Sequence, residues 1–569
     1  MLRSSGVLTL AHACGLLQGV ALAAVECTGT FKSISASEYV AAINPGWNIG
    51  NTLDATPNEG SWNNPPAKAG TFKDIKAAGF KSVRIPVTYA DHFSGPAPGW
   101  EIDAGWLQRV SDVVDMALDA GLYVLTNVHH DSWKWADVSA SGANLTEIEE
   151  RMYRTWLQIG EKLGCKSSSV AFEPINEPPV ETQEQAAELN KLNGIFLAAL
   201  KDSGGFNTQR VVTLVGPSMD SIKTSKWFEA PTGYDNPWAL QYHYYSPYDF
   251  IFSAWGKTTL SDADIAAVES DLEHIRANFT DVPLVLGEFD ASPLNTEPAA
   301  RRKYMDVVVR KAKELDTAVI VWDNGLDHFD RDTKKWKDPQ SLEILLNAAA
   351  GVSNSLSDYT TDASATEQSS SAYVFHKVGD DVTDQKISIS LNGNTLKSIA
   401  TDEGAELDAS TDYAASGGDI IFKSSFLSTY LSSEVPGSKV NLTLTFSAGA
   451  TAAVNVVQWD LPKLRSTSSK AVAGAALRVP VTWAGIHQPA AVKMLRNDGV
   501  FLFDDWTRYL GPLQAAYGTF SGQWNWDGGD IILTQMTVDA VIAAGVATTF
   551  TFDFFPRVPG NSLNYTLTV

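Results

Sequence analysis

Two glutamates each end a short apolar run of the chain, and a pair of carboxyl groups can cleave a glycosidic bond. Glu177 ends the run at residues 170–177, and Glu288 ends the run at residues 283–288. Hydrolysis of such a bond needs one carboxyl group that protonates the leaving oxygen and a second that attacks the anomeric carbon or activates water. Mutual repulsion and partial burial would keep one group neutral and the other charged. The pair predicts glycoside hydrolysis, provided that the fold brings the two side chains together.

Two residues of another apolar run could support this pair. His243 and Tyr245 are two residues apart, so in a strand both side chains point to the same face. In that position His243 could tune the pKa of Glu177, and Tyr245 could orient Glu288.

Three further side chains near the ends of apolar runs suit a sugar. Asn176 could bond a ring hydroxyl, Arg84 could hold a neighbouring carboxylate ionised, and Trp322 offers a flat apolar face on which a pyranose can stack. The arginine and the tryptophan have ordinary structural alternatives, since a lone arginine is more often structural and a lone tryptophan more often belongs to the core. His129 and His130 could be part of a metal site, but no third ligand is spaced to complete it, so neither a metal nor a cofactor is expected.

Eight apolar runs alternate with amphipathic stretches between residue 24 and about residue 350. Apolar runs between helical patterns are typical of buried parallel strands. The predicted fold class is therefore α/β, a (β/α)8 TIM barrel whose strand ends converge on one rim. A doubly wound open sheet is the alternative, although it usually has a glycine-rich phosphate loop, which this sequence lacks. The expected strands are residues 45–50, 81–86, 122–129, 170–177, 211–215, 240–245, 283–288 and 318–323.

The composition changes after the barrel, which is expected over residues 24–349. Residues 350–371 are rich in Ser, Thr and Ala, as in a linker. Short alternating strands with turn signals then replace the helical pattern. A second break predicts two β-sandwich-like modules, at residues 372–464 and 465–569. Both contain the sequence GGDII, which suggests that they share one plan.

The N-terminus has the form of a secretory signal. Residues 1–23 combine Arg3 with an apolar stretch that ends in small residues. A membrane anchor is the weaker alternative, because polar residues interrupt the stretch. We therefore expect a secreted, extracellular chain with no membrane contact after the signal is removed. Four Asn-X-Thr sequences, which fit a glycoprotein, begin at Asn144, Asn278, Asn441 and Asn564.

Charge and cysteine content limit the classes of partner. The formal net charge is −23, so the chain should repel nucleic acid, whereas a neutral polysaccharide raises no electrostatic objection. Cys27 and Cys165 remain after removal of the signal; they could pair, but two cysteines are not a disulfide framework. A monomer is expected.

Seven segments together resemble glycoside hydrolase family 5, the cellulase family. They occur in the family's order across most of residues 40–330, and are NIGN at 48–51, VRIPV at 83–87, NVHHD at 127–131, INEP at 175–178, HYY at 243–245, LGEF at 286–289 and WDNG at 322–325. The resemblance implies a (β/α)8 barrel with retaining chemistry and no metal.

The resemblance also implies roles for individual residues. Glu177 would be the general acid/base and Glu288 the nucleophile. The expected substrate-binding residues are Arg84, His129, His130, Asn176, His243, Tyr245, Trp322 and Trp133, and of the two histidines the first fits the family better. Trp62, Trp133 and Trp135 follow strands in loops, where they could stack sugar rings.

The opening segment at residues 46–54 resembles the endoglucanase and xyloglucanase branch. It implies a secreted retaining endo-β-1,4-glucanase acting on cellulose-type, xyloglucan or mixed-linkage β-glucan. A β-mannanase or β-1,3-glucanase with the same chemistry, or a non-catalytic polysaccharide-binding protein, are the alternatives.

The two tail modules resemble known companions of cellulases. The first is similar to the immunoglobulin-like X2 module, and the second to carbohydrate-binding module family 46. Trp524 and Trp526 lie two residues apart in the second and could stack a sugar chain, or could belong to its core. This module could grip polysaccharide or fold back to complete the barrel's cleft, or both modules could be spacers.

Overall fold

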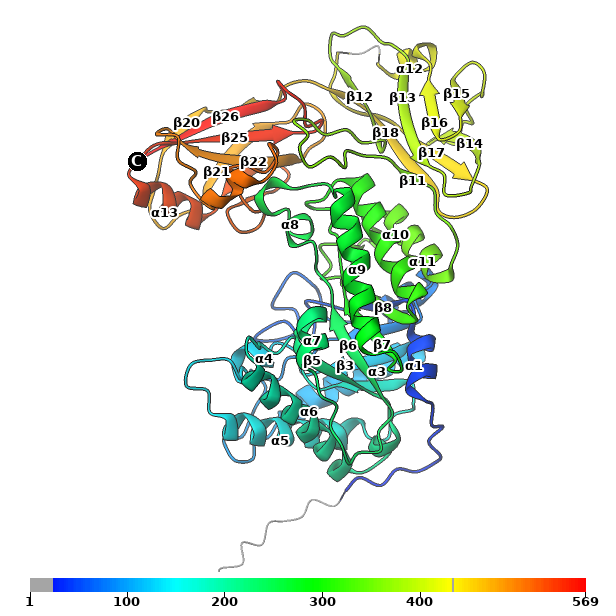
Figure 1. Ribbon diagram of the computed structural model, residues 1–569, viewed down its shortest axis with the longest axis vertical. Coiled ribbons are helices and arrows are strands. Elements are labelled where there is room, and N and C mark those ends of the chain that lie inside the picture. Colours follow the sequence, from blue (N-terminus) through cyan, green and yellow to red (C-terminus); the bar gives the residue numbers. More distant parts are fainter. Residues whose placement is uncertain (1–23, 432–433) are drawn as a thin grey trace, which may run out of the picture.

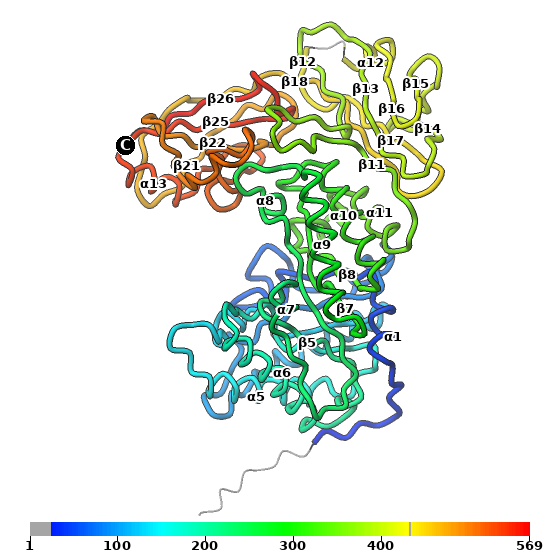
Figure 2. The backbone as a smooth tube through the Cα atoms, viewed as in Figure 1, coloured from blue at the N-terminus to red at the C-terminus, as the bar shows by residue number. Residues whose placement is uncertain are grey.

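The computed structural model describes residues 24–431 and 434–569. The predicted signal at residues 1–23 lies outside the described residues. The barrel occupies the lower half of the molecule, and the two β modules lie side by side above it (Figure 1). The continuous tube in Figure 2 shows that the chain passes from the barrel to the second module and then returns over the barrel with the third.

Eight parallel strands close into a barrel in the order β1 to β8. This confirms the predicted fold class, and each strand lies within or overlaps one of the eight apolar runs. The strands are β1 (Gly46–Asn48), β2 (Ser82–Ile85), β3 (Tyr123–Asn127), β4 (Val170–Glu173), β5 (Val212–Asp220), β6 (Trp238–His243), β7 (Leu284–Glu288) and β8 (Thr317–Val321).

Helices surround the barrel. The longer ones are α2 (Ala69–Ala78), α3 (Ala104–Asp119), α5 (Leu145–Leu163), α6 (Gln183–Ser203), α7 (Ser221–Trp227), α9 (Asp262–Asn278), α10 (Pro298–Glu314) and α11 (Pro339–Ala350). Shorter elements in the connections are α4 (Asp131–Lys134), η1 (Asn207–Gln209), α8 (Tyr248–Ile251), η2 (Ala254–Gly256), β9 (Phe329–Asp330) and β10 (Lys335–Trp336).

The first helix, α1 (Ala36–Ile43), plugs the amino end of the barrel. Its apolar face packs on inward-pointing strand residues such as Leu125 and Ile320, and the Tyr39 hydroxyl donates to the Val124 carbonyl at 2.7 Å. The helix begins with a capping box between Ser35 and Glu38, which satisfies backbone donors that the helix itself cannot. With this end closed, the opposite rim is left for a site.

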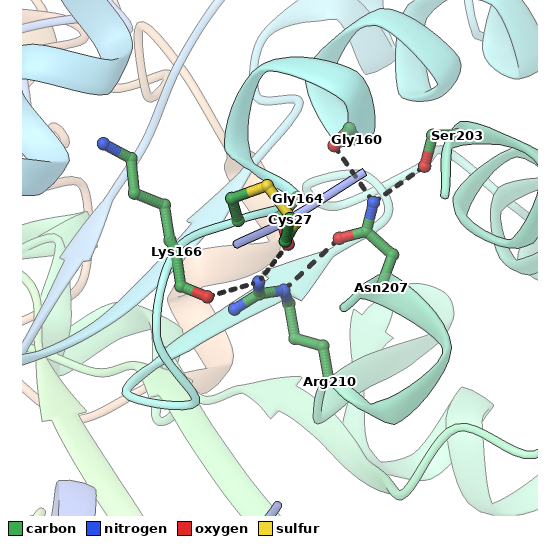
Figure 3. The surroundings of a disulfide bond; sticks show 8 residues. Cys27, Gly160, Gly164, Lys166, Ser203, Asn207 and Arg210 are labelled. Atoms are coloured by element: carbon green, nitrogen blue, oxygen red, sulfur yellow. Dashed lines mark hydrogen bonds between the residues drawn. A yellow bond between two sulfur atoms is a disulfide. The ribbon is translucent and has the colours of Figure 1, made fainter. Parts of the chain in front are cut away.

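A disulfide between Cys27 and Cys165 ties the N-terminal segment to the connection between α5 and β4 (Figure 3). Beside it, the buried Arg210 donates to the carbonyls of Gly164 and Lys166 at 3.2 and 2.8 Å. Asn207 donates to the Gly160 carbonyl at 3.0 Å. The structure thus pairs the two cysteines that the sequence left open.

The two β modules are sandwiches with the same strand order, as their shared sequence suggested. In the second module the sheets run β11-β13-β16-β15 and β12-β18-β17-β14, and in the third β19-β21-β24-β23 and β20-β26-β25-β22. The GGDII sequence of each module leads into the matching strand, which is β16 in the second module and β24 in the third. The second module contains β11 (Leu356–Ser357), β12 (Tyr373–Lys377), β13 (Gln385–Ser390), β14 (Leu396–Thr401), β15 (Tyr413–Ser416), β16 (Asp419–Phe422), α12 (Ser424–Leu431), β17 (Gly437–Phe446) and β18 (Ala452–Trp459). The third contains β19 (Lys463–Leu464), β20 (Ser468–Lys470), β21 (Leu477–Thr482), β22 (Pro489–Arg496), η3 (Asp505–Tyr509), β23 (Trp524–Trp526), β24 (Asp530–Leu533), α13 (Gln535–Ala544), β25 (Thr548–Phe554) and β26 (Ser562–Thr568).

The segment predicted as a linker, residues 350–371, is folded against its neighbours. It contributes β11 to the second module, and the Ser370 hydroxyl donates to the buried Glu297 of the barrel at 2.5 Å. Gln368 accepts from the Thr258 hydroxyl at 2.8 Å and donates its backbone N–H to the Arg557 carbonyl at 2.9 Å. This residue therefore joins all three parts of the chain.

The third module docks on the rim of the barrel. Arg557 donates to the Gly256 carbonyl at 2.8 Å, and Gln488 donates to the Leu294 carbonyl at 2.8 Å. Gly256 and Leu294 lie in the loops that follow β6 and β7, so the module sits at the carboxyl ends of the strands. Within the described part of the chain, no helix is long and apolar enough to cross a membrane.

Candidate active site

Glu177 and Glu288 meet at the carboxyl end of the barrel. Glu288 ends β7 and Glu177 follows β4, and one carboxylate oxygen from each lies within 4.8 Å of the other. Nδ1 of His243, at the end of β6, lies 2.7 Å from Glu177 Oε1 and 3.6 Å from Glu288 Oε2. The Glu177 side chain is 27% exposed and the Glu288 side chain 5%. One carboxyl group therefore faces solvent, and its partner lies deeper in the barrel.

Arg84, fully buried on β2, organises the floor of the site. Its guanidinium donates to Glu288 Oε1 at 2.5 Å, to Asn48 Oδ1 at 3.0 Å and to Asn176 Oδ1 at 2.7 Å. Two further bonds of 2.7 Å form a bidentate pair with Glu173. Paired charge-assisted bonds of this kind fix the plane of the guanidinium, and so the position of the N–H that reaches Glu288.

Glu173 was missed in the sequence, although it stands four residues before Glu177 in the same run. Its side chain is completely buried, and besides Arg84 it accepts from Asn127 at 2.8 Å and Gln241 at 2.8 Å. A signal did exist, because a charged residue inside a barrel strand needs a buried partner of opposite charge. Arg84 on β2 is a charged residue of this kind, and Glu173 on β4 is its partner.

Tyr245 and Arg84 together set the charge state of Glu288. The Tyr245 hydroxyl donates to Glu288 Oε2 at 2.8 Å, and burial, followed by the charges of Glu288 and Glu177, raises the tyrosine pKa well above its usual value. Burial also raises the pKa of Glu288, against the opposing charges of His243 and Arg84. Because both oxygens of Glu288 accept from groups that keep their protons, the hydrogen bonds favour its ionised form.

Glu177 differs in that only His243 supports its charge at short range. Burial would raise the pKa of Glu177, but the hydrogen bond and charge of His243 outweigh burial and lower it. His243 Nδ1 lies 2.7 Å from Glu177 Oε1, within hydrogen-bond distance. The arrangement therefore sets two carboxyl groups with different hydrogen-bond partners side by side.

Asn127 fixes the tautomer of His129. Its Nδ2 donates to Glu173 Oε1 at 2.8 Å and lies 3.0 Å from His129 Nδ1. Nδ1 must accept, so the proton of the neutral ring is on Nε2. Burial, with the charges of His130 and Arg84 added, lowers the pKa of His129 well below its usual value. His129 is therefore a neutral hydrogen-bond donor.

Two groups of three residues among those described have the spacing of metal ligands. One is Glu177 with His243 and Glu288, and the other is Asp54 with His129 and His130. In the first group, the positive charge of the Arg84 guanidinium, which is bonded to Glu288, would repel a metal cation. In the second, Nε2 of His129 carries its proton, and both oxygens of Asp54 accept backbone N–H groups at 2.9 and 2.6 Å. The hydrogen bonds therefore suit polar recognition better than metal binding.

Aromatic rings line one side of the site. Trp322 lies parallel to His129, with ring centres 6.0 Å apart, and His130 lies between Trp62 and Trp133 at 5.4 and 4.9 Å. Trp62 and Trp133 are 39% and 53% exposed, so their faces are available. All of these residues were predicted from the sequence to contact substrate.

Trp135 is different from its neighbours in the same loop. Its indole N–H donates to Asp131 at 2.6 Å, and the Arg151 guanidinium covers its ring at 4.5 Å. Arg151 thus occupies a face of this ring, and the role of Trp135 as a stacking platform stays a prediction.

On the other side, a series of aromatic rings leads from the site to the third module. Neighbouring ring centres are 6.1 Å apart between Tyr245 and Phe252, 4.9 Å between Phe252 and Tyr248, and 5.9 Å between Tyr248 and Trp255. Trp255 then meets Trp506 of the third module at 4.6 Å. Folding back of this module onto the barrel was one of the alternatives from the sequence, but the residues that meet depend on how the modules dock.

Within the third module, the predicted sugar-binding pair is mostly internal. Trp524 is 2% exposed and packs in the core beside Phe520, with its indole N–H donating to the Gly518 carbonyl at 3.2 Å. Of the two alternatives that the sequence left open for Trp524, its burial supports a place in the core and not contact with carbohydrate. Trp526 is half-buried against the same core, and the exposed tryptophan of this module is Trp506, at 45%.

Comparison with known proteins places this site in a family. Residues 48–328 match the model of the cellulase family, glycosyl hydrolase family 5, and residues 368–456 match carbohydrate binding domain X2. Endoglucanase A of Paenibacillus barcinonensis is 30% identical over 52% of this chain and 84% of its own length. The chain belongs to glycoside hydrolase family 5.

Similarity to other family 5 members extends over all three modules. Endoglucanase B of Paenibacillus lautus is 29% identical over 96% of this chain and 94% of its own. A tri-modular family 5, subfamily 4 endo-β-1,4-glucanase from Bacillus licheniformis, solved with cellotetraose, aligns with a TM-score of 0.84, 33% identity and coverage of 94% of this chain and 99% of its own. The predicted resemblance to family 5 with an X2 module is confirmed, and the chain is a glycoside hydrolase.

Proposed function

We propose that this chain is a retaining endo-β-1,4-glucanase in which Glu288 is the nucleophile and Glu177 the general acid/base. The observation that carries the proposal is the approach of the two carboxylates to within 4.8 Å at the open rim. Retaining glycosidases have carboxyl groups about 5–5.5 Å apart, whereas inverting ones leave about 6.5–9.5 Å for a water molecule. The names of the similar endoglucanases and the cellotetraose complex support β-1,4-glucan as the substrate.

In the first step, a Glu288 oxygen attacks the anomeric carbon and forms a glycosyl ester. The bond from that carbon to the glycosidic oxygen breaks, and Glu177 gives its proton to this oxygen, which leaves as the hydroxyl of the departing chain. Glu177 ends this step as a carboxylate, and His243, whose Nδ1 lies 2.7 Å from Glu177 Oε1, holds that side chain in place. Positive charge that develops on the sugar ring is stabilised by the Glu288 carboxylate.

In the second step, Glu177 as carboxylate takes a proton from a water molecule, whose oxygen attacks the same carbon. The bond to Glu288 breaks, Glu288 leaves as carboxylate, and Glu177 ends protonated as at the start. Two displacements on one carbon retain its configuration. Arg84 and Tyr245 keep Glu288 aligned in both steps, and Asn176, His129 and Trp322 hold the reacting sugar.

The third module extends the substrate path in this proposal. The series of rings from Tyr245 to Trp506 gives apolar faces beyond the reacting carbon. The apolar face of a pyranose can stack on such aromatic rings. A glucan chain longer than the barrel groove would reach Trp506, whereas a short oligosaccharide would not. Cellulose-type, xyloglucan and mixed-linkage β-glucan remain the proposed substrates.

Export fits both the disulfide and the substrate. A disulfide persists in oxidising compartments and is rare in the cytosol, and a polysaccharide is met outside the cell. We therefore keep the proposal that residues 1–23 direct secretion.

Variants of the two glutamates test the chemistry. Glu288→Gln should abolish release of reducing ends from a panel of soluble polysaccharides yet still bind cellotetraose, whereas Glu150→Gln, an exposed change on α5, should behave as the unaltered enzyme. On a dinitrophenyl cellobioside, whose leaving group needs no acid, Glu177→Ala should regain turnover with azide and give a β-glycosyl azide, because azide needs no general base. Near-full activity of Glu288→Gln, or an azide product of inverted configuration from Glu177→Ala, would overturn the assignment.

A further inference from the structure

The end of β5 departs from a regular strand next to Glu177. Pairing with β6 is regular as far as Val215 opposite Gln241, and resumes at Asp220 opposite His243. Residues 216–219 therefore stand opposite Tyr242 alone. Irregularities of this kind re-aim side chains next to active sites, and here the redirected side chain is Met219.

The backbone is strained both at the end of β5 and at Glu177. Ser218 and Met219 have φ of 53° and 51°, and Glu177 has φ of 38°. All three lie in the left-handed region, which non-glycine residues occupy only when surrounding contacts hold them. A strained main chain at Glu177 implies that neighbouring groups determine where its carboxyl group points.

The bulge supplies those contacts. The backbone N–H of Glu177 donates to the sulfur of Met219, with nitrogen and sulfur 3.2 Å apart. The backbone N–H of Ser218 donates to the Pro178 carbonyl at 3.0 Å, and its hydroxyl lies 3.4 Å from both the N and O of Val180. Met219 is completely buried, so its sulfur lies away from water.

We propose that Met219 is a positioning residue for Glu177: its sulfur holds the left-handed main chain of Glu177, and so aims the proton donor at the glycosidic oxygen. The inference rests on the proposed role of Glu177 as general acid/base. A thioether is a weak acceptor, but leucine, of similar size, has no acceptor atom and would take this partner from the part-buried N–H of Glu177.

The test compares two substrates that differ in their need for a proton. The leaving group of cellotetraose is a basic sugar alkoxide that requires protonation by the acid. The dinitrophenolate of a dinitrophenyl cellobioside leaves without protonation. The quantity measured is kcat/KM, which reports the first displacement alone. Met219→Leu should lower kcat/KM on cellotetraose roughly ten-fold, a part of the 10²–10⁴ that a general acid contributes, and change it less than about two-fold on the aryl substrate.

Two further variants complete the design. Met305→Leu changes an equally buried methionine on α10 and should leave both substrates unaffected. Met219→Gln restores an acceptor oxygen and should recover part of the cellotetraose activity. Melting temperatures recorded for each variant separate loss of folding from loss of positioning.

Equal losses on the two substrates, or no loss on either, would overturn the role of Met219. Glu177→Gln keeps this result distinct from the proposed function. If Glu177→Gln loses equal activity on both substrates, the assignment of Glu177 as the acid fails. If Glu177→Gln loses more activity on cellotetraose than on the aryl substrate, but Met219→Leu does not, only the positioning role is refuted.

Discussion

The substitution Gly50→Ala would test whether the position of Trp322 matters for turnover. Gly50 follows β1 and lies under the indole of Trp322. A methyl group built on Gly50 would come within 2.7 and 2.8 Å of two ring carbons and 3.0 Å of the Asp323 carbonyl oxygen. Ordinary carbon contacts are about 3.5–4.0 Å, so one partner must move by about 0.8 Å.

The ring is the partner that must move. The Gly50 backbone is held by three hydrogen bonds, its N–H to the Asp323 carbonyl at 3.0 Å and its carbonyl from Thr52 and Asn64 at 3.0 and 2.8 Å. Overpacking of this size costs about 1–3 kcal/mol. A displacement of about 1 Å in a substrate-positioning group can cost about 10²-fold in rate, so we expect kcat/KM to fall by about 10- to 100-fold.

The assay is kcat/KM on cellotetraose together with urea unfolding of the same samples. Gly70→Ala is the matched control, because Gly70 is exposed on α2 with nothing within 4 Å of the added methyl. That change should stabilise the helix by about 0.5–1 kcal/mol and leave turnover unchanged. A folded Gly50→Ala enzyme that keeps kcat/KM within about two-fold would refute the reasoning that Trp322 is a substrate platform.

Three other predictions follow from the same structure. Cys27→Ser should lower the free energy of unfolding by up to about 5 kcal/mol, the loop-entropy value for cysteines 138 residues apart, and added reductant should have no further effect on this variant. Burial opposes the charge of His328, but Asp290 at 2.6 Å raises the pKa of His328 to about 9. The raised pKa stabilises the fold fully below pH about 6.5, and about 3 kcal/mol should be lost as pH rises through 9, with a flatter pH profile in Asp290→Asn. Trp506→Ala should reduce turnover of long β-glucan several-fold and leave cellotetraose turnover unchanged; equal effects on both would contradict an extended substrate path.

The sequence was sufficient for the barrel and for the centre of the site. Apolar runs between helical patterns locate parallel strands, and the rim of a barrel collects whatever ends those strands. Glu177, Glu288, Arg84 and Tyr245 could be found in this way because each ends or lies in such a run, and the fold alone brings them together.

Other features depend on contacts between segments far apart in the chain. The sulfur of Met219 reaches Glu177 only because β5 bulges, and apolar periodicity carries no signal for a bulge. Trp524 and Trp506 are both tryptophans in a β module, and only the packing of the sheets decides which ring is covered. The docking of the third module rests on backbone carbonyls such as that of Gly256, which are the same for every residue type.

The buried charges of the floor make sense as a set when the proposed reaction is followed through its intermediate. Arg84 pairs with both Glu173 and Glu288, and when Glu288 becomes an ester it loses its charge. An arginine paired with Glu288 alone would then be left uncompensated in the barrel, which is strongly unfavourable. Glu173 never reacts, and its bonds to Asn127 and Gln241 keep it ionised beside Arg84 throughout. The cation can therefore stabilise Glu288 before attack and after release without trapping the enzyme in either state.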